Sequence, residues 1–377
     1  MGARDDAECR AWAYLARAAE PPSAAVLALC DDLGPVDAAD AIRSRSVPRG
    51  HEAALEVTGA RADTDMSGED LEIADRVGAR LVTRADDEWP GWQLMALGQA
   101  DTAFRGGEPL ALWVRGPGRL DEMAGAGIAL VGSRAASSYG EQVTSSLAGG
   151  LAAEGVAVIS GAAYGIDGAA HRAALACGAP TIAVMACGID REYPAGHARL
   201  ISEIAAHGLV VSEYPPGTTA AKHRFLTRNR LVAAMANAVI VIEAGRRSGA
   251  ANTAAWARKL GRPLGAVPGP VTSATSVGCH QMIADGSAVL VFDAPSALAL
   301  SAPDATLGTG GGRARSTDSL SSDEKRVHDA IPGRGAVTID EIAFSAGLDL
   351  AVVRSALARM DVSGHVQNVD GAWKLAR

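Results

Sequence analysis

The chain has 377 residues, 48% of them hydrophobic, which is enough for roughly two or three domains and excludes a disordered protein. Its formal net charge is −8, and its five scattered cysteines, none in a C-x-x-C pair, argue against a disulfide framework or a zinc site. It has no apolar run long enough to span a bilayer and no apolar signal core at the N-terminus, so we expect a cytoplasmic protein without membrane contact.

The first segment, residues 1–85, is predicted to be a small helical domain of the SAM-like type. Apolar residues recur at helical spacing in AWAYLARAAE and again in SGEDLEIADRVG. Turn signals such as Pro21-Pro22 and Gly34-Pro35 separate the helices. Ser67 precedes two acidic residues and is predicted to cap the second of these helices.

The second segment, residues 86–295, alternates strand-like apolar runs with stretches long enough for helices. The runs are GIALVGSR (127–134), VAVIS (156–160), PTIAVMACG (180–188), LVVSEY (209–214), NAVIVIEAG (237–245) and LGAVPG (264–269). Near-continuous apolar strands separated by helices predict a parallel sheet covered on both faces, an extended Rossmann-like, doubly wound α/β fold. Ligands of such folds bind at the carboxyl ends of the strands.

The third and fourth segments are a linker and a small module. Gly and Ser dominate GTGGGRARSTDSLSS, so residues 296–322 are predicted to be a flexible linker. In residues 323–377, a capping box from Thr338 to Glu341 opens a helix, and a hairpin is predicted to turn at Asp370-Gly371. Helices followed by a hairpin indicate a winged helix, which could bind either DNA or protein.

Positive charge is concentrated in residues 214–284. This stretch holds nine Lys and Arg residues against one acidic residue, a balance of +8, so the remainder of the chain carries −16. The densest part is KHRFLTRNR (222–230), where Lys222, Phe225 and Asn229 fall on one face of a helix and Arg224 and Arg228 on a neighbouring face.

Cations interleaved with an aromatic ring are typical of single-strand binding, in which charge follows the backbone and the ring stacks on a base. We therefore predict a basic funnel for a nucleic-acid backbone. The alternative interpretation is a solvated helix whose Phe225 belongs to the core.

Glycine turns follow the first two parallel strands. Gly132-Ser133-Arg134 would offer free backbone N–H groups and a guanidinium fork to a phosphate, although a purely structural turn is as plausible. The chain has neither G-x-G-x-x-G at this turn nor a Walker P-loop, so we expect no NAD, no ATP hydrolysis and no other cofactor.

The second turn, SGAAYGID (160–167), raises a hydrolase alternative through Ser160, Asp167 and His171. Asp167 and His171 are better interpreted as a helix-surface pair, and no G-x-S-x-G elbow surrounds Ser160. Gly161 and Gly165 are predicted to let another backbone or a ligand approach closely. We predict no catalytic residue and no metal site.

Seven motifs occur together in one order: VGSR, SGAAYGIDGAAH, CGIDREYP, SEYPPGT, HRFLTRNR, VIEAGRRSGAANTA and AVPGPV. In the presence and order of these motifs, residues 88–295 resemble the DprA family, also called Smf. The resemblance implies a non-enzymatic protein that binds and protects single-stranded DNA, dimerises through its Rossmann-like domain and loads the RecA recombinase in natural transformation. It also implies that Arg134, Lys222 and Phe225 form the DNA pocket.

The predicted DNA-binding residues come from three places in the sequence. They are Gly132, Ser133, Arg134, Ser160, Gly161, Gly165, Asp167, Lys222, Arg224, Phe225, Arg228, Asn229 and Arg230. The chain departs from the family pattern at Ala186, at Ala250-Ala251 and at His280, and we expect these changes to adjust the pocket without abolishing it.

Two alternatives remain. The first is a nucleotide-processing enzyme of the lysine-decarboxylase-like Rossmann group, which would need a P-G-G-x-G-T-x-x-E motif; the chain has PGPVTSATSVG (268–278) and no such Glu. The second is an adaptor that works mainly through its helical and winged-helix domains, for which the Rossmann-like segment alone would bind no DNA.

Overall fold

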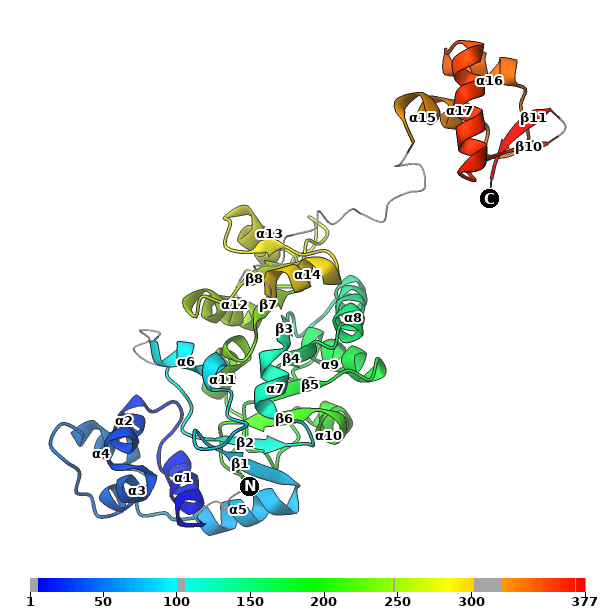
Figure 1. Cartoon of the computed structure of the whole chain (residues 1–377). Coiled ribbons are helices and arrows are strands. Elements are labelled where there is room, and N and C mark those ends of the chain that lie inside the picture. Colours follow the sequence, from blue (N-terminus) through cyan, green and yellow to red (C-terminus); the bar gives the residue numbers. More distant parts are fainter. Residues whose placement is uncertain (1–5, 100–105, 247, 302–319, 370, 377) are drawn as a thin grey trace. The chain divides into compact units, whose positions relative to one another are not determined.

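The computed structural model describes residues 6–99, 106–246, 248–301, 320–369 and 371–376. The chain divides into two compact units, Met1–Thr306 and Leu307–Arg377. Figure 1 shows the elements of both units in sequence colours.

A nine-stranded sheet forms the centre of the first unit in the described ranges. Its strands are β1 (Ala79–Val82), β2 (Leu112–Arg115), β3 (Gly127–Val131), β4 (Ala157–Ser160), β5 (Thr181–Met185), β6 (Leu209–Ser212), β7 (Ala238–Val241), β8 (Leu264–Ala266) and β9 (Val289–Leu290). The order across the sheet is β1-β2-β6-β5-β4-β3-β7-β8-β9. All pairs from β6 to β9 are parallel, whereas β1 and β2 are antiparallel additions at one edge.

The six predicted apolar runs are confirmed as β3 to β8, and their side chains explain why they are apolar throughout. In β3, Ile128 and Leu130 pack into one core cluster, while Ala129 and Val131 pack into another on the opposite face. A strand buried on both faces has no position for a polar alternation. The Rossmann-like interpretation of the fold is therefore correct.

Helices cover both faces of this sheet (Figure 1). One layer contains α6 (Gly91–Gln99), α7 (Leu120–Gly125), α11 (Lys222–Ala234), α12 (Gly249–Lys259) and α13 (Val277–Ala284). The other contains α8 (Ser138–Ala153), α9 (Ile166–Ala176), α10 (Ala198–His207) with its preceding 3₁₀ turn (Ala195–His197), and α14 (Ala294–Ser301).

The strand order reverses between β3 and β7. From β3 the chain adds β4, β5 and β6 on one side, and then returns to place β7, β8 and β9 on the other. The loops that follow β3 and β7 consequently diverge and leave a crevice at the carboxyl ends, which is where doubly wound folds bind their ligands.

Residues 6–76 form five helices: α1 (Asp6–Ala18), α2 (Ala24–Leu33), α3 (Pro35–Arg43), α4 (Glu52–Thr58) and α5 (Ser67–Arg76). Their core is continuous with Trp113 of β2, so they pack against the edge of the sheet. The predicted segment 1–85 also contains β1, which belongs to the sheet. The capping prediction for Ser67 is wrong, because Met66 holds the N-cap position and makes no side-chain cap bond.

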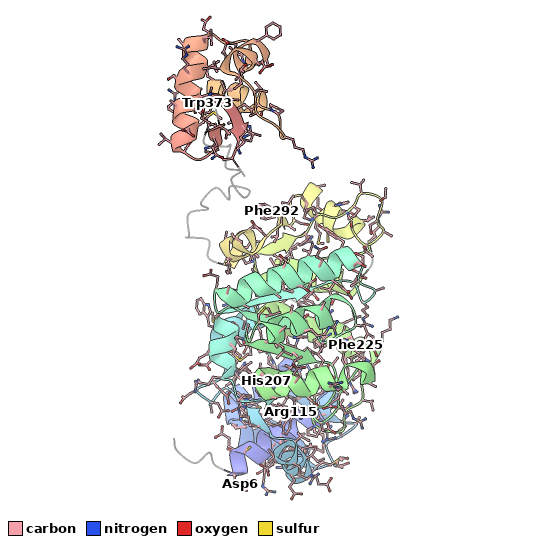
Figure 2. All side chains as sticks on the ribbon, turned by 90° about the vertical axis from the view of Figure 1, so that its right-hand side faces the viewer. Asp6, Arg115, His207, Phe225, Phe292 and Trp373 are labelled. Atoms are coloured by element: carbon pink, nitrogen blue, oxygen red, sulfur yellow. The ribbon has the colours of Figure 1, made fainter. Side chains whose placement is uncertain are left out.

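The second unit has three helices and a hairpin in its described residues: α15 (Ser322–Asp329), α16 (Ile339–Ala346), α17 (Leu350–Val362), β10 (Val366–Val369) and β11 (Ala372–Leu375). This arrangement confirms the winged helix, whose Trp373 is labelled in Figure 2. The capping box predicted at Thr338 and Glu341 is present. Of the predicted linker, residues 296–301 belong to α14 and residues 302–319 lie outside the described residues.

In the part of the chain that the structure describes, no helix is long and apolar enough to cross a membrane. The same residues contain no group of three or more His, Cys, Asp or Glu side chains arranged to hold a metal ion.

Candidate nucleic-acid interface

A pocket of about 610 Å³ opens at the carboxyl ends of β3 and β4, with Phe225 (labelled in Figure 2) in its wall. Its lining comes from the end of β3, from the loops after β3 to β7, and from the helices α9, α11 and α12. The lining residues are Val131, Gly132, Ser133, Arg134, Ala135, Gly161, Ala163, Asp167, Tyr193, Ala220, Ala221, Lys222, Phe225, Leu226, Arg228, Asn229, Val232, Ser248, Gly249, Ala250 and Thr253.

Helix N-termini converge on this pocket. The segments that open α11 and α12 belong to its lining, and α9 begins at Ile166, next to the lining residue Asp167. Ser248 caps α12 by accepting a hydrogen bond from the backbone N–H of Ala251 at 3.2 Å. The first N–H groups of a helix have no partner within the helix and carry partial positive charge, so this arrangement favours an anion in the pocket.

The register predicted for KHRFLTRNR is confirmed on α11. Lys222, Phe225 and Asn229 all line the pocket, as spacings of three and four residues on one helix face require. Lys222 is exposed, Phe225 is partly exposed and Asn229 is buried. The amide of Asn229 also donates to the Asn252 side chain of α12 at 3.2 Å, which ties the two helices together at the pocket floor.

Arg134 reaches the same place from the loop after β3. Its guanidinium carbon lies 5.0 Å from the centroid of the Phe225 ring, a cation–π distance. Arg134 is exposed, as is Lys222, and no carboxylate among the described residues forms an ion pair with either. Two unpaired cations therefore flank one partly exposed aromatic ring.

Arg228 also lines the pocket, but it is buried and its guanidinium group bonds backbone carbonyls of the protein. Its Nη1 donates to the carbonyl of Gly161 at 2.6 Å and to that of Val184, so it joins α11 to the ends of β4 and β5. A Cβ on Gly161 would stand 2.5 Å from Arg228 Nη2, which is why the strand end requires glycine. Burial lowers the pKa of Arg228, and the nearby Asp167 opposes that effect.

Asp167 is the one carboxyl group in the described lining. It is buried and accepts a hydrogen bond from the Ala163 N–H at 3.4 Å. Burial raises the pKa of Asp167, with Arg228 acting in the opposite direction. Burial therefore favours the uncharged form of Asp167, which limits its repulsion of an anion in the pocket.

The remaining glycines hold the loops after β3 and β4 together. Gly165 has φ +75°, and a Cβ there would lie 2.2 Å from the carbonyl oxygen of Ser133. A Cβ on Gly132 would lie 2.5 Å from Ile166 Cγ1. The close approach predicted at Gly161 and Gly165 is thus present, made by an arginine side chain at Gly161 and by backbone at Gly165.

The hydrolase alternative fails on geometry. Ser160 is buried, donates to the Leu130 carbonyl at 2.6 Å and does not line the pocket, contrary to its predicted role. His171 is also buried, with Nδ1 2.8 Å from Thr181 Oγ1, and burial lowers its pKa to about 3. Interpreting Asp167 and His171 as a surface pair was wrong, because the sheet and neighbouring helices cover both.

Two arginines of the basic stretch point away from the pocket, contrary to the predicted funnel. Arg230 is fully buried and bonds Glu213 at 2.5 Å, and Arg224 bonds Glu20 at 2.7 Å. A guanidinium fork matches a carboxylate well. Glu20 lies 204 positions from Arg224 in the chain, and Glu213 lies 17 positions from Arg230. With Arg228 also buried, Lys222 is the one cation of residues 222–230 that is both exposed and in the pocket lining.

Sequence reasoning missed Tyr193, which follows β5 and lines the pocket with its ring centroid 5.7 Å from that of Phe225. The motif CGIDREYP could have drawn attention to it. Of the departures from the family pattern, Ala250 lines the pocket, whereas His280 lies outside the lining with Nε2 2.9 Å from the Gly269 carbonyl oxygen.

These features define a class: a Rossmann-like α/β protein with an electropositive, aromatic pocket at its strand-order reversal, carrying a winged helix later in the chain. The family described as DNA recombination-mediator protein A matches residues 80–300, and the DprA winged helix domain matches residues 312–372. The chain belongs to the DprA family.

Relatives include a DNA processing protein DprA of Mycobacterium tuberculosis, 52% identical over 375 residues, which cover 99% of this chain and 95% of the relative. The crystal structure of DprA from Streptococcus pneumoniae matches with 33% identity and a TM-score of 0.59, over 73% of this chain and 90% of the other. DprA from Helicobacter pylori, described for its single-stranded DNA binding mode, matches with 30% identity and a TM-score of 0.50, over 57% and 92%.

Proposed function

We propose that this protein binds single-stranded DNA in the pocket between β3, β4, α11 and α12. The main support for this proposal is that Arg134 lies over the Phe225 ring, while Lys222, which has no carboxylate partner among the described residues, lies on the same wall of the pocket. The description of the Helicobacter pylori relative, which concerns single-stranded DNA, supports this proposal.

The chemistry of the pocket matches the two parts of a nucleotide. Phosphates are attracted by Arg134, Lys222 and the helix N-termini, and a base stacks on Phe225. A duplex keeps its bases stacked on one another, so their faces are not available to the ring. We therefore expect a preference for single strands over duplex.

We further propose that the bound strand is protected and handed to the RecA recombinase during natural transformation or DNA recombination, by a cytoplasmic homodimer joined through the Rossmann-like domain. These steps rest on the resemblance to the family. The protein would act without catalysis, because Ser160 and His171 each hold other partners and assemble no triad.

The test is fluorescence anisotropy with a short labelled oligo-dT and with the corresponding duplex. We expect the wild type to prefer the single strand, and Arg134→Ala, Lys222→Ala and Phe225→Ala each to weaken binding by about 1–3 kcal/mol. A wild type that binds neither form would contradict the proposal and would leave the basic segment as a protein-docking or structural surface.

A further inference from the structure

Two tyrosines beside the pocket have half-exposed rings, in a chain that has few aromatic residues. Tyr164, after β4, retains 49% of its accessible surface, and Tyr193, after β5, retains 47%. Only 4% of the chain is Phe, Trp or Tyr. A single exposed ring needs no explanation, but two at one rim need a reason for being there.

The two tyrosines share a second hollow with Phe225. This hollow, of about 50 Å³, adjoins the main pocket, since both are lined by Arg134, Gly161, Ala163, Tyr193, Phe225 and Arg228. The Tyr193 and Phe225 rings stand 5.7 Å apart between centroids, tilted by 47°. Tyr164 lines the small hollow and does not line the main pocket.

The other walls of the small hollow suit a base better than an ion. Met185, Ala186 and Pro194 are uncharged, and no carboxylate belongs to its described lining. Arg134 and Arg228 supply positive charge at the boundary with the main pocket. Aromatic and apolar walls with cations at one side match a base whose phosphate lies toward Arg134.

Tyr164 is held in place before any ligand arrives. Its ring meets that of His197 edge-on, with centroids 4.8 Å apart and an interplanar angle of 66°. His197 is itself buried, with Nδ1 3.0 Å from the Ala162 carbonyl oxygen. An aromatic ring positioned in advance loses little conformational entropy on stacking, which favours its use as a binding surface.

We propose that Tyr193 and Tyr164 form a second stacking platform, which takes the base next to the one on Phe225 in a single strand. This inference rests on the proposed function and extends it from one nucleotide to at least two. Arg134, which lines both hollows, then contacts the phosphate between the two bases. The recognition is sequence-tolerant, because every base offers a flat face to a ring.

The experiment uses the full chain and labelled oligo-dT, with Tyr193→Ala, Tyr164→Ala and the ring-preserving Tyr193→Phe and Tyr164→Phe. We expect each alanine variant to bind about tenfold more weakly and each phenylalanine variant to bind as the wild type does. Trp92→Ala is the matched control, because Trp92 is a 75% exposed aromatic on α6 that lines neither hollow.

Oligonucleotides with one abasic site, moved along the strand, separate stacking from a structural effect. In the wild type, an abasic site opposite the platform weakens binding, and in Tyr193→Ala the same abasic site costs nothing further. The platform is refuted if the abasic site weakens the binding of Tyr193→Ala as much as it weakens the binding of the wild type. It is also refuted if the phenylalanine variants bind as weakly as the alanine variants.

Failure of the platform can be told apart from failure of the proposed function. If the tyrosine variants bind like the wild type while Arg134→Ala and Phe225→Ala bind weakly, the platform alone is wrong. If the wild type binds no oligonucleotide, both proposals fall together.

Discussion

Glu20 holds Arg224 through two hydrogen bonds, 2.7 Å from Nε and 3.1 Å from Nη2. Glu20 lies between α1 and α2, and Arg224 lies in the first turn of α11, so the N-terminal helices are fastened to the helix that carries Lys222 and Phe225. His223 and Arg61 also contact this carboxylate, at 3.3 Å and 2.7 Å.

The first prediction concerns the pH dependence of this contact. Burial raises the pKa of Glu20, but hydrogen bonds from Arg224 and Arg61 outweigh it and hold the pKa at about 2, below the ordinary 4.5. A carboxyl group with a lowered pKa in the folded state stabilises the protein above its unfolded pKa, and this stabilisation is lost as the pH falls toward 2.

Glu20→Gln should therefore lower the Tm at neutral pH, and the gap to the wild type should narrow as the pH falls from about 5 toward 2. Thermal unfolding over a pH series measures the gap. Glu122→Gln is the control, because its pair with Arg119 at 3.2 Å is exposed and should contribute little. A gap of equal size at pH 3 and pH 7 would show that the charge of Glu20 is irrelevant.

The second prediction separates Arg230 from the DNA-binding residues. Arg230 and Glu213 are both buried and bonded at 2.5 Å, and burial raises the pKa of Glu213 while Arg230 opposes this rise. Arg230→Met should cost about 3–5 kcal/mol of folding free energy, because it leaves a buried carboxyl group without its partner.

Arg230→Met combined with Glu213→Leu should recover most of that loss, since apolar side chains of similar size replace a buried ion pair well. Denaturant unfolding provides both free energies. If the double variant were as unstable as the single one, the packing of the arginine stem, and not its charge pairing, would be the main contribution.

The third prediction assigns different roles to Lys222 and Phe225 through salt dependence. Each phosphate contact to a single strand contributes roughly 0.7 to the slope of log affinity against log salt. Lys222→Ala should lower that slope by about 0.7, whereas Phe225→Ala should weaken binding at every salt concentration and leave the slope unchanged. Anisotropy titrations over a salt series give both quantities.

Lys259→Ala serves as the control for Lys222→Ala, because Lys259 is an exposed lysine at the far end of α12 and does not line the pocket. Its slope should equal that of the wild type. A slope that falls equally in both variants would mean that charge acts on DNA from the whole surface and not from the pocket.

The fourth prediction tests the contact between the loops after β3 and β4. Gly165→Ala should destabilise the protein by more than Gly178→Ala, although both glycines have positive φ, at +75° and +68°. A Cβ at position 165 meets the Ser133 carbonyl oxygen at 2.2 Å, whereas at position 178 nothing lies within 4 Å. Denaturant unfolding should show about 1 kcal/mol for Gly178→Ala and a larger loss for Gly165→Ala, and equal losses would remove the steric explanation.

The sequence predicted well those elements whose structure can be inferred from consecutive residues. The runs that became β3 to β8 are apolar because both faces of a central strand are buried, and this is visible in the residues themselves. The strands β1, β2 and β9 were missed. β1 and β9 lie at the two edges of the sheet, and β2 pairs antiparallel with both of its neighbours, outside the alternation of parallel strands and helices on which the prediction rested.

By itself, the sequence determined the doubly wound fold, the winged helix and the common face of Lys222, Phe225 and Asn229, because periodicity and spacing are properties of consecutive residues. Only the tertiary structure decided which cations face the pocket. Arg224, Arg228 and Arg230 look alike in KHRFLTRNR, yet they bond Glu20, the Gly161 carbonyl and Glu213 in turn. These partners stand on other elements, as far as 204 positions away in the chain, so the pairing becomes visible only after folding.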